Sequence, residues 1–191
     1  MKFLTYLLGM LRISMASIKP ENIPAYISNH SDKLWLEIVN GIVDSTIQRV
    51  KLHPVRLELL VDTGEFDTEE MFDRISSVTE DHIDDEDMEK FLSTITFDTI
   101  IFKQKHMHIY STKTGNSDNR GGGCGDFGFG KDDFKLDIEN ENGITLLDLV
   151  KSVYRLKGSK YDFHYEMFSS IKIVKCDDSN IKVRVMFDYG S

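Results

Sequence analysis

The stretch that decides the fold is residues 171–187, with the sequence IKIVKCDDSNIKVRVMF. Two runs in which apolar and polar residues alternate, 171–176 and 181–187, are joined by Asp-Asp-Ser-Asn. Alternation with a period of two is typical of a strand with one buried face, and the polar residues between the runs indicate a hairpin. The side chains of the second run that we expect to face the core are Ile181, Val183, Val185 and Phe187.

Three further segments have strand character. Residues 97–110 alternate over a long run, residues 134–138 alternate over a short one, and residues 55–61 are a short apolar run. Between the first two lies the segment 112–131, which contains seven glycines and few core-forming side chains. We expect this segment to be a flexible glycine-rich loop that connects two strands paired with each other.

Helices are predicted from apolar residues at spacings of three and four. The strongest pattern covers residues 32–51, and Pro54 cannot continue this helix because proline has no backbone N–H. A short helix is also indicated after Asp85. Two other helices each begin at a pair of polar residues three positions apart, as in a capping box. The pair is Asp67 and Glu70 for the helix 68–79, and Thr145 and Asp148 for the helix 145–157.

The composition favours one folded domain. Hydrophobic residues make up 40% and aromatic residues 10% of the 191 positions, and there are three prolines. A chain of this kind has enough core-forming side chains to fold, and its length suits one domain of ordinary size. We therefore predict a single α+β domain over residues 17–191, in which about three helices cover a mostly antiparallel sheet.

The first residues, 1–16, leave three alternatives open. They begin with a basic residue and an apolar run and end with small residues, as in a signal peptide, but the run is too short to span a bilayer. They can equally be an extension ahead of Met15 or a packed helix. The chain has only two cysteines, with no CxxC spacing, and this favours a reducing compartment.

The net charge of −9 is unevenly distributed. Residues 56–98 contain 15 acidic and three basic side chains, whereas residues 151–184 contain eight basic and four acidic ones. Opposed regions of this kind suggest a protein partner, self-association or pairing within the chain. The acidic balance disfavours nucleic acid, and we expect no membrane partner unless residues 1–16 are retained as an anchor.

His106 and His108 are the candidate metal ligands, because residues two apart on a strand point to the same face. Cys124, Asp126 or His164 would complete a zinc site. Without a second spaced pair of ligands, the simpler interpretation is a solvated strand face that also carries Gln104 and Tyr110.

Cys124 is also the candidate nucleophile, provided that a histidine such as His106, His108 or His164 lies close enough to lower its pKa. Its glycine neighbours give access but little positional precision. Gly123, Gly125 and Gly128 match the GxGxxG spacing of dinucleotide-binding loops. That motif needs a strand directly before it and a helix directly after it, and this segment has neither. We expect no cofactor.

The last part of the chain resembles uncharacterised proteins of amoeba-infecting giant DNA viruses of the mimivirus kind. The residues that carry the resemblance are 154–168, YRLKGSKYDFHYEMF, and 182–191, KVRVMFDYGS. The resemblance implies a protein of the host cytoplasm or the virion, and it assigns no functional residue. The leading hypothesis is thus a non-enzymatic viral accessory or interaction protein. The alternative is a small metal- or cysteine-dependent hydrolase that uses Cys124 or the His106 and His108 face.

Overall fold

The computed structural model describes residues 16–50, 66–111, 135–158 and 167–188. These ranges confirm the expected class, a single-domain α+β fold whose strands pair mostly antiparallel. The elements in chain order are α1 (Ala25–Ser28), α2 (Asp32–Val50), α4 (Thr68–Thr79), α5 (Asp85–Leu92), β1 (Ile100–Phe102), β2 (His106–Ser111), β3 (Lys135–Glu139), β4 (Ile144–Thr145), α6 (Leu146–Gly158), β5 (Met167–Cys176) and β6 (Asn180–Asp188).

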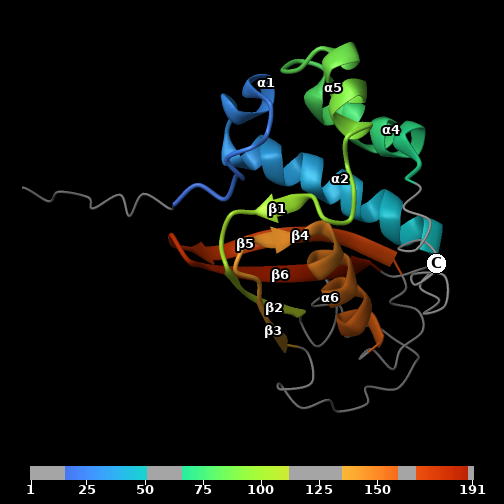
Figure 1. Ribbon diagram of the computed structural model, residues 1–191. Coiled ribbons are helices and arrows are strands. Elements are labelled where there is room, and N and C mark those ends of the chain that lie inside the picture. Colours follow the sequence, from blue (N-terminus) through green and yellow to red (C-terminus); the bar gives the residue numbers. More distant parts are fainter. Residues whose placement is uncertain (1–15, 51–65, 112–134, 159–166, 189–191) are drawn as a thin grey trace, which may run out of the picture.

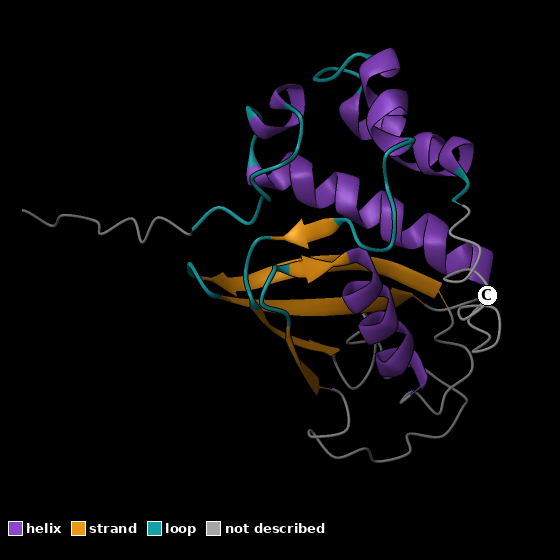
Figure 2. Cartoon of the chain, viewed as in Figure 1, coloured by secondary structure: helices purple, strands orange, loops and turns teal. Residues whose placement is uncertain are grey.

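The predicted hairpin is confirmed as β5 and β6, which pair antiparallel at one side of a four-stranded sheet (Figure 2). Its turn is closed by Asp177, whose Oδ1 accepts hydrogen bonds from the backbone N–H groups of Ser179 and Asn180 at 3.1 and 2.8 Å. Together with a bond from the Asn180 side chain, these donors hold the pKa of the Asp177 carboxyl below its ordinary value, because they stabilise the ionised form.

The four-stranded sheet has the order β3-β2-β6-β5. The predicted pairing of the strands that flank the glycine-rich segment is confirmed, because β2 and β3 are antiparallel neighbours. The pairing of β2 with β6 is parallel, which the hairpin pattern alone does not predict. The segments 55–61 and 112–131 lie outside the described residues, so the first predicted strand and the flexible loop stay predictions.

The single strand predicted over 97–110 is wrong. The chain instead forms β1, which pairs with β4 in a separate two-stranded sheet, and then β2 in the main sheet. Between them, Lys103 donates its backbone N–H to Ile18, and Lys105 donates to the carbonyl of Ser179. At these bonds the backbone leaves the pairing of β1 with β4 and enters the main sheet as β2, so the alternation of side chains is interrupted there.

This interruption also overturns the placement of Gln104 on a solvated face. Gln104 is fully buried, and its Nε2 donates to the carbonyl oxygens of Ser17 at 3.1 Å and Asp177 at 3.2 Å. The side chain thus joins the start of the described chain to the β5–β6 turn. A buried amide needs such partners, because burying it without hydrogen bonds costs free energy.

The predicted helices are confirmed as α2, α4, α5 and α6. The carboxylate of Asp67 accepts from the N–H of Glu70 at 3.0 Å and caps α4. At α6, the Thr145 hydroxyl accepts from the N–H of Asp148, and the Asp148 carboxylate accepts from the N–H of Thr145. This reciprocal capping box satisfies two backbone donors that the first helical turn leaves unpaired.

Helices α2 and α6 pack on one face of the main sheet, and α4 and α5 lie beyond α2 (Figure 1). The inner sheet face is apolar and belongs to one continuous core, which includes Met107, Ile109, Ile181, Val183 and Val185. The opposite, outer face carries the polar residues of the same strands. The fold therefore has a helical side and an open sheet side.

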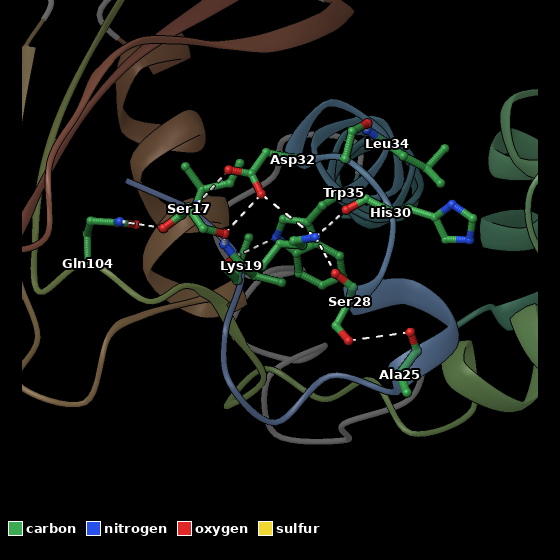
Figure 3. A network of polar contacts seen from close by, with 12 residues as sticks. Ser17, Lys19, Ala25, Ser28, His30, Asp32, Leu34, Trp35 and Gln104 are labelled. Carbon is green, nitrogen blue, oxygen red and sulfur yellow. Dashed lines mark hydrogen bonds and ion pairs between the residues drawn. The ribbon is translucent and has the colours of Figure 1, made fainter. Parts of the chain in front are cut away.

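The chain that leads into α2 is held by a polar network (Figure 3). The Ser17 hydroxyl donates to a carboxylate oxygen of Asp32 at 2.9 Å. The ammonium group of Lys19, whose side chain is 12% exposed, donates to the carbonyl oxygens of Ser28 and His30. Residues 1–15 precede this anchor and lie outside the described ranges, so the alternatives for the first segment stay predictions.

Candidate functional site

The outer face of the main sheet holds the two histidines singled out by the sequence. His106 and His108 both lie on β2 with their side chains on this face, where they are 46% and 36% exposed. The residues directly opposite them on β3 are Glu139 and Asp137. Each histidine is therefore paired across the strands with a carboxylate.

The closer of the two pairs is His108 and Asp137, with 2.6 Å between Nδ1 and Oδ1. An ionised carboxylate only accepts hydrogen bonds, so Nδ1 of His108 carries the proton and its Nε2 faces away from Asp137. The other pair is longer, with 3.9 Å between Nδ1 of His106 and Oε1 of Glu139. This distance allows electrostatic attraction but is too long for a direct hydrogen bond.

The predicted metal site depended on more than these histidines. Within the ranges that the structure describes, no three histidine, cysteine or acidic side chains are placed so that they can hold a metal ion. Cys124, Asp126 and His164 lie outside these ranges. The metal site and the cysteine nucleophile thus stay predictions. Among the described residues, the partner of the His108 side chain is the carboxylate of Asp137.

The other cysteine, Cys176, is buried at the end of β5. Burial raises the pKa of its thiol to about 11, and the nearby carboxylate of Asp177 acts in the same direction. A thiol is a nucleophile only as thiolate, so the raised pKa disfavours Cys176 as a nucleophile near neutral pH.

A hollow of about 570 Å³ lies on the outer face, between the histidine row and the basic side chains of the hairpin. Lys175 and Lys182 form its basic wall, while His106, His108 and Asp137 are on the other side. The ammonium group of Lys182 also lies 5.2 Å from the ring centre of Tyr110, which is a cation–π distance.

The basic side chains of β5 and β6 meet as like charges across the strands. Lys172 is directly opposite Arg184, and Lys175 is opposite Lys182. Among the described residues, none of the four has a carboxylate within 4 Å. Like charges directly opposite each other destabilise a sheet, and the contact of Lys182 with Tyr110 and the attraction between Lys175 and Asp177 offset only part of this repulsion.

The acidic side chains lie elsewhere. In the described part of residues 56–98 they are carried mainly by α4 and α5, which are separated from the sheet by α2 (Figure 1). Within the described ranges, no ion pair joins an acidic side chain of these helices to a basic one of β5 or β6. The acidic helices and the basic side chains of β5 and β6 therefore lie on different sides of the molecule, whereas Lys151 and Arg155 of the basic region lie on α6.

Sequence reasoning missed Asp137 and Glu139 as partners of the histidines. The alternation in 134–138 placed their segment on a strand, and its pairing with the preceding strand was expected. The register that places Asp137 opposite His108 had no sequence signal, because it depends on how the 23 residues from 112 to 134 connect the strands.

The chain matches no protein-family model, no curated protein and no solved structure with which it was compared. Among the helices of the described ranges, none combines the length and the apolar content that crossing a bilayer requires. The features of this chain that bear on function are therefore the polar side chains of the outer sheet face and the distribution of charge.

Proposed function

We propose that this chain is a non-enzymatic interaction protein and that the outer face of its sheet binds an acidic protein surface. The observation that carries the proposal is the pair of like-charge contacts, Lys172 with Arg184 and Lys175 with Lys182. An acidic surface laid over these four side chains would remove their mutual repulsion. The binding free energy would then include the relief of a cost already present in the fold.

This chain itself carries an acidic surface, so a second copy can serve as the acidic partner. Glu86 and Glu89 on α5 and Asp81 in the turn between α4 and α5 are exposed, and the two helices lie on the far side of α2 from the sheet. An acidic helix of one copy on the basic face of another is a head-to-tail contact, which builds rings or chains rather than two-fold dimers. We infer self-association of this head-to-tail kind.

Light scattering coupled to size-exclusion chromatography tests this contact at roughly 0.05 M and 0.5 M salt. We expect concentration-dependent association at low salt and monomers at high salt, because salt screens exposed charges. The double variant Lys175→Glu with Lys182→Glu should be monomeric at both. The matched control reverses Lys151 and Arg155, which are exposed on α6 and away from the outer face.

A charge swap makes the test specific. The variant Asp81→Lys with Glu89→Lys should also be monomeric alone, and mixing it with Lys175→Glu, Lys182→Glu should restore a complex. A wild-type protein that is strictly monomeric at every salt concentration would overturn self-association. Binding of a polyglutamate peptide by that monomer, lost in the lysine variant, would still support an acidic partner.

The resemblance of residues 154–168 and 182–191 to giant-virus proteins supports a viral accessory role, in the host cytoplasm or in the virion. Mass spectrometry of purified virions and of the cytoplasm of infected amoebae tests this part of the proposal. Peptides of this chain in either fraction would support it, and their absence from both would overturn it.

The alternative function is a small metal- or cysteine-dependent hydrolase. The contact between His108 and Asp137 favours it, because a carboxylate on Nδ1 orients a histidine for ligation or proton transfer through Nε2. Elemental analysis of the purified full chain, with a thiol titration near neutral pH, tests this alternative. Bound zinc lost in His106→Ala, or a thiol that titrates below pH 7, would support it over the interaction protein.

A further inference from the structure

The edge of the sheet at β5 borders a groove that is separate from the outer face. Strand β5 pairs only with β6 in the described part of the chain, and its other edge runs beside α2 (Figure 1). A groove of about 540 Å³ lies between them. Its apolar lining comes from Ala16, Ile18, Leu36, Ile171, Ile173 and Cys176. Its charged lining consists of Asp32, Lys33 and Glu37 at the α2 side and Lys172 on β5.

One position of this edge is already paired, by a side chain rather than by a strand. Asn40 on α2 accepts the backbone N–H of Ile171 at its Oδ1, 2.7 Å away, and its Nδ2 donates to the Ile171 carbonyl at 3.4 Å. A side-chain amide has the same donor and acceptor as a peptide group. Asn40 thus imitates one residue of a neighbouring strand.

The next edge position has no partner among the described residues. Because Ile171 directs its N–H and C=O toward the edge, the alternation of an antiparallel ladder directs those of Ile173 the same way. Within the described ranges no side chain is bonded to these groups as Asn40 is to Ile171. An unpaired strand edge beside a helix is the arrangement to which extended peptides add as a further strand.

We infer that the groove between α2 and β5 binds an extended peptide, which pairs with the backbone of β5 at Ile173. The pairing ends before Ile171, because the Asn40 side chain already bonds the backbone groups of that residue. The chemistry of the two sides of the added strand differs. Side chains on its inner side would meet Leu36 and the other apolar residues of the groove. Side chains on its outer side would lie across from Lys172, so acidic residues are favoured there.

The partner is therefore a segment in which acidic and apolar residues alternate. This second interaction surface shares Lys172 with the outer face, but it differs from it in using the backbone edge of β5 and the groove. A fluorescein-labelled peptide of seven residues, with glutamate alternating with valine, is a suitable probe. The matched control is the same peptide with its valine nitrogens methylated, which removes the edge-pairing donors.

Fluorescence anisotropy with the full chain should show saturable binding of the alternating peptide and binding at least about tenfold weaker for the methylated one. Hydrogen exchange by NMR should slow at the amide of Ile173 by about tenfold or more on addition of peptide. The variant Leu36→Lys should weaken peptide binding by a similar factor while its circular dichroism stays native. The exposed control Lys151→Glu should bind the peptide as the wild type does.

Any of three results would overturn the inference. Equal affinity for the methylated peptide, or slowed exchange at β3 in place of Ile173, would show that the peptide does not pair with β5. Binding that appears only after removal of residues 1–15 would show that the chain's own first residues are the occupant. If the wild-type chain shows no salt-dependent self-association but still binds the peptide, that result counts only against the self-association proposed at the outer face.

Discussion

The indole Nε1 of Trp35 donates a hydrogen bond of 2.9 Å to the carbonyl oxygen of Ile101. Trp35 is fully buried on α2, and Ile101 is the middle residue of β1, so the bond joins two elements 66 positions apart. The indole also meets the ring of Phe91 on α5, with 6.1 Å between the ring centres. The only tryptophan of the chain thus ties α2, α5 and β1 together.

We expect Trp35→Phe to lower the free energy of unfolding by about 1–3 kcal/mol, because the buried carbonyl of Ile101 loses its partner. Trp35→Ala should cost more, about 3–5 kcal/mol, since it also leaves a cavity. Urea unfolding followed by circular dichroism measures both values. Equal stability of Trp35→Phe and the wild type would mean that the hydrogen bond contributes nothing.

Gly41 on α2 packs directly against Ile75 on α4, and a helix propensity scale does not take this contact into account. A Cβ built at Gly41 would overlap Cγ1 of Ile75. Glycine to alanine inside a helix normally stabilises by about 1 kcal/mol, whereas here we expect Gly41→Ala to destabilise by about 1–3 kcal/mol. Thermal unfolding of a double-mutant cycle with Ile75→Ala checks the cause, because the pair should be less destabilised than the sum of the single variants.

Lys19 should contribute to stability because its side chain, unlike that of most lysines, is largely buried and hydrogen-bonded. Its ammonium group donates to the carbonyl oxygens of Ser28 and His30 and is close to Asp32 (Figure 3). We expect Lys19→Met to lower the free energy of unfolding by about 1–3 kcal/mol, because two carbonyls lose a charged donor. The exposed neighbour Lys33 is the control, and Lys33→Met should change stability by less than about 0.5 kcal/mol.

Cys176 should react slowly with alkylating reagents in the folded protein. Its thiol pKa is about 11 instead of 9.0, so its thiolate fraction near neutral pH is about a hundredfold lower. Iodoacetamide labelling at pH 8, with the modified peptide quantified by mass spectrometry, should be at least that much faster in urea. Similar labelling rates with and without urea would contradict the burial of Cys176.

The same pKa predicts an alkaline limit to stability. The thiol pKa is higher in the folded than in the unfolded chain, so its contribution is fully present below about pH 9. It is lost as pH rises toward 11, because the unfolded chain releases its thiol proton first. The melting temperature of the wild type should therefore fall more steeply between pH 9 and 11 than that of Cys176→Ala, as measured by circular dichroism.

Local signals predicted most of the secondary structure. The capping pairs Asp67 with Glu70 and Thr145 with Asp148 act over three residues, and both form the expected hydrogen bonds. The hairpin over 171–187 was predictable because its turn is only four residues long. The strand over 97–110 was mispredicted because alternation alone cannot reveal a change from one ladder to another.

The candidate site was only half predictable. Placing His106 and His108 on one face needed nothing beyond the period of a strand. Pairing His108 with Asp137 needed the register between β2 and β3, and placing Lys182 beside His108 needed the parallel pairing of β6 with β2. Both are contacts between distant segments, which no pattern in the neighbouring sequence encodes.

The sequence by itself determined the helices, the final hairpin and the existence of an acidic and a basic region, because each depends on residues a few positions apart. Only the tertiary structure decided that the acidic helices and the basic hairpin lie on different sides, that Gln104 is buried, and that Asn40 pairs with Ile171 over 131 positions. These features arise when hydrophobic burial brings distant segments together, and the partner of each polar group then depends on the complete packing.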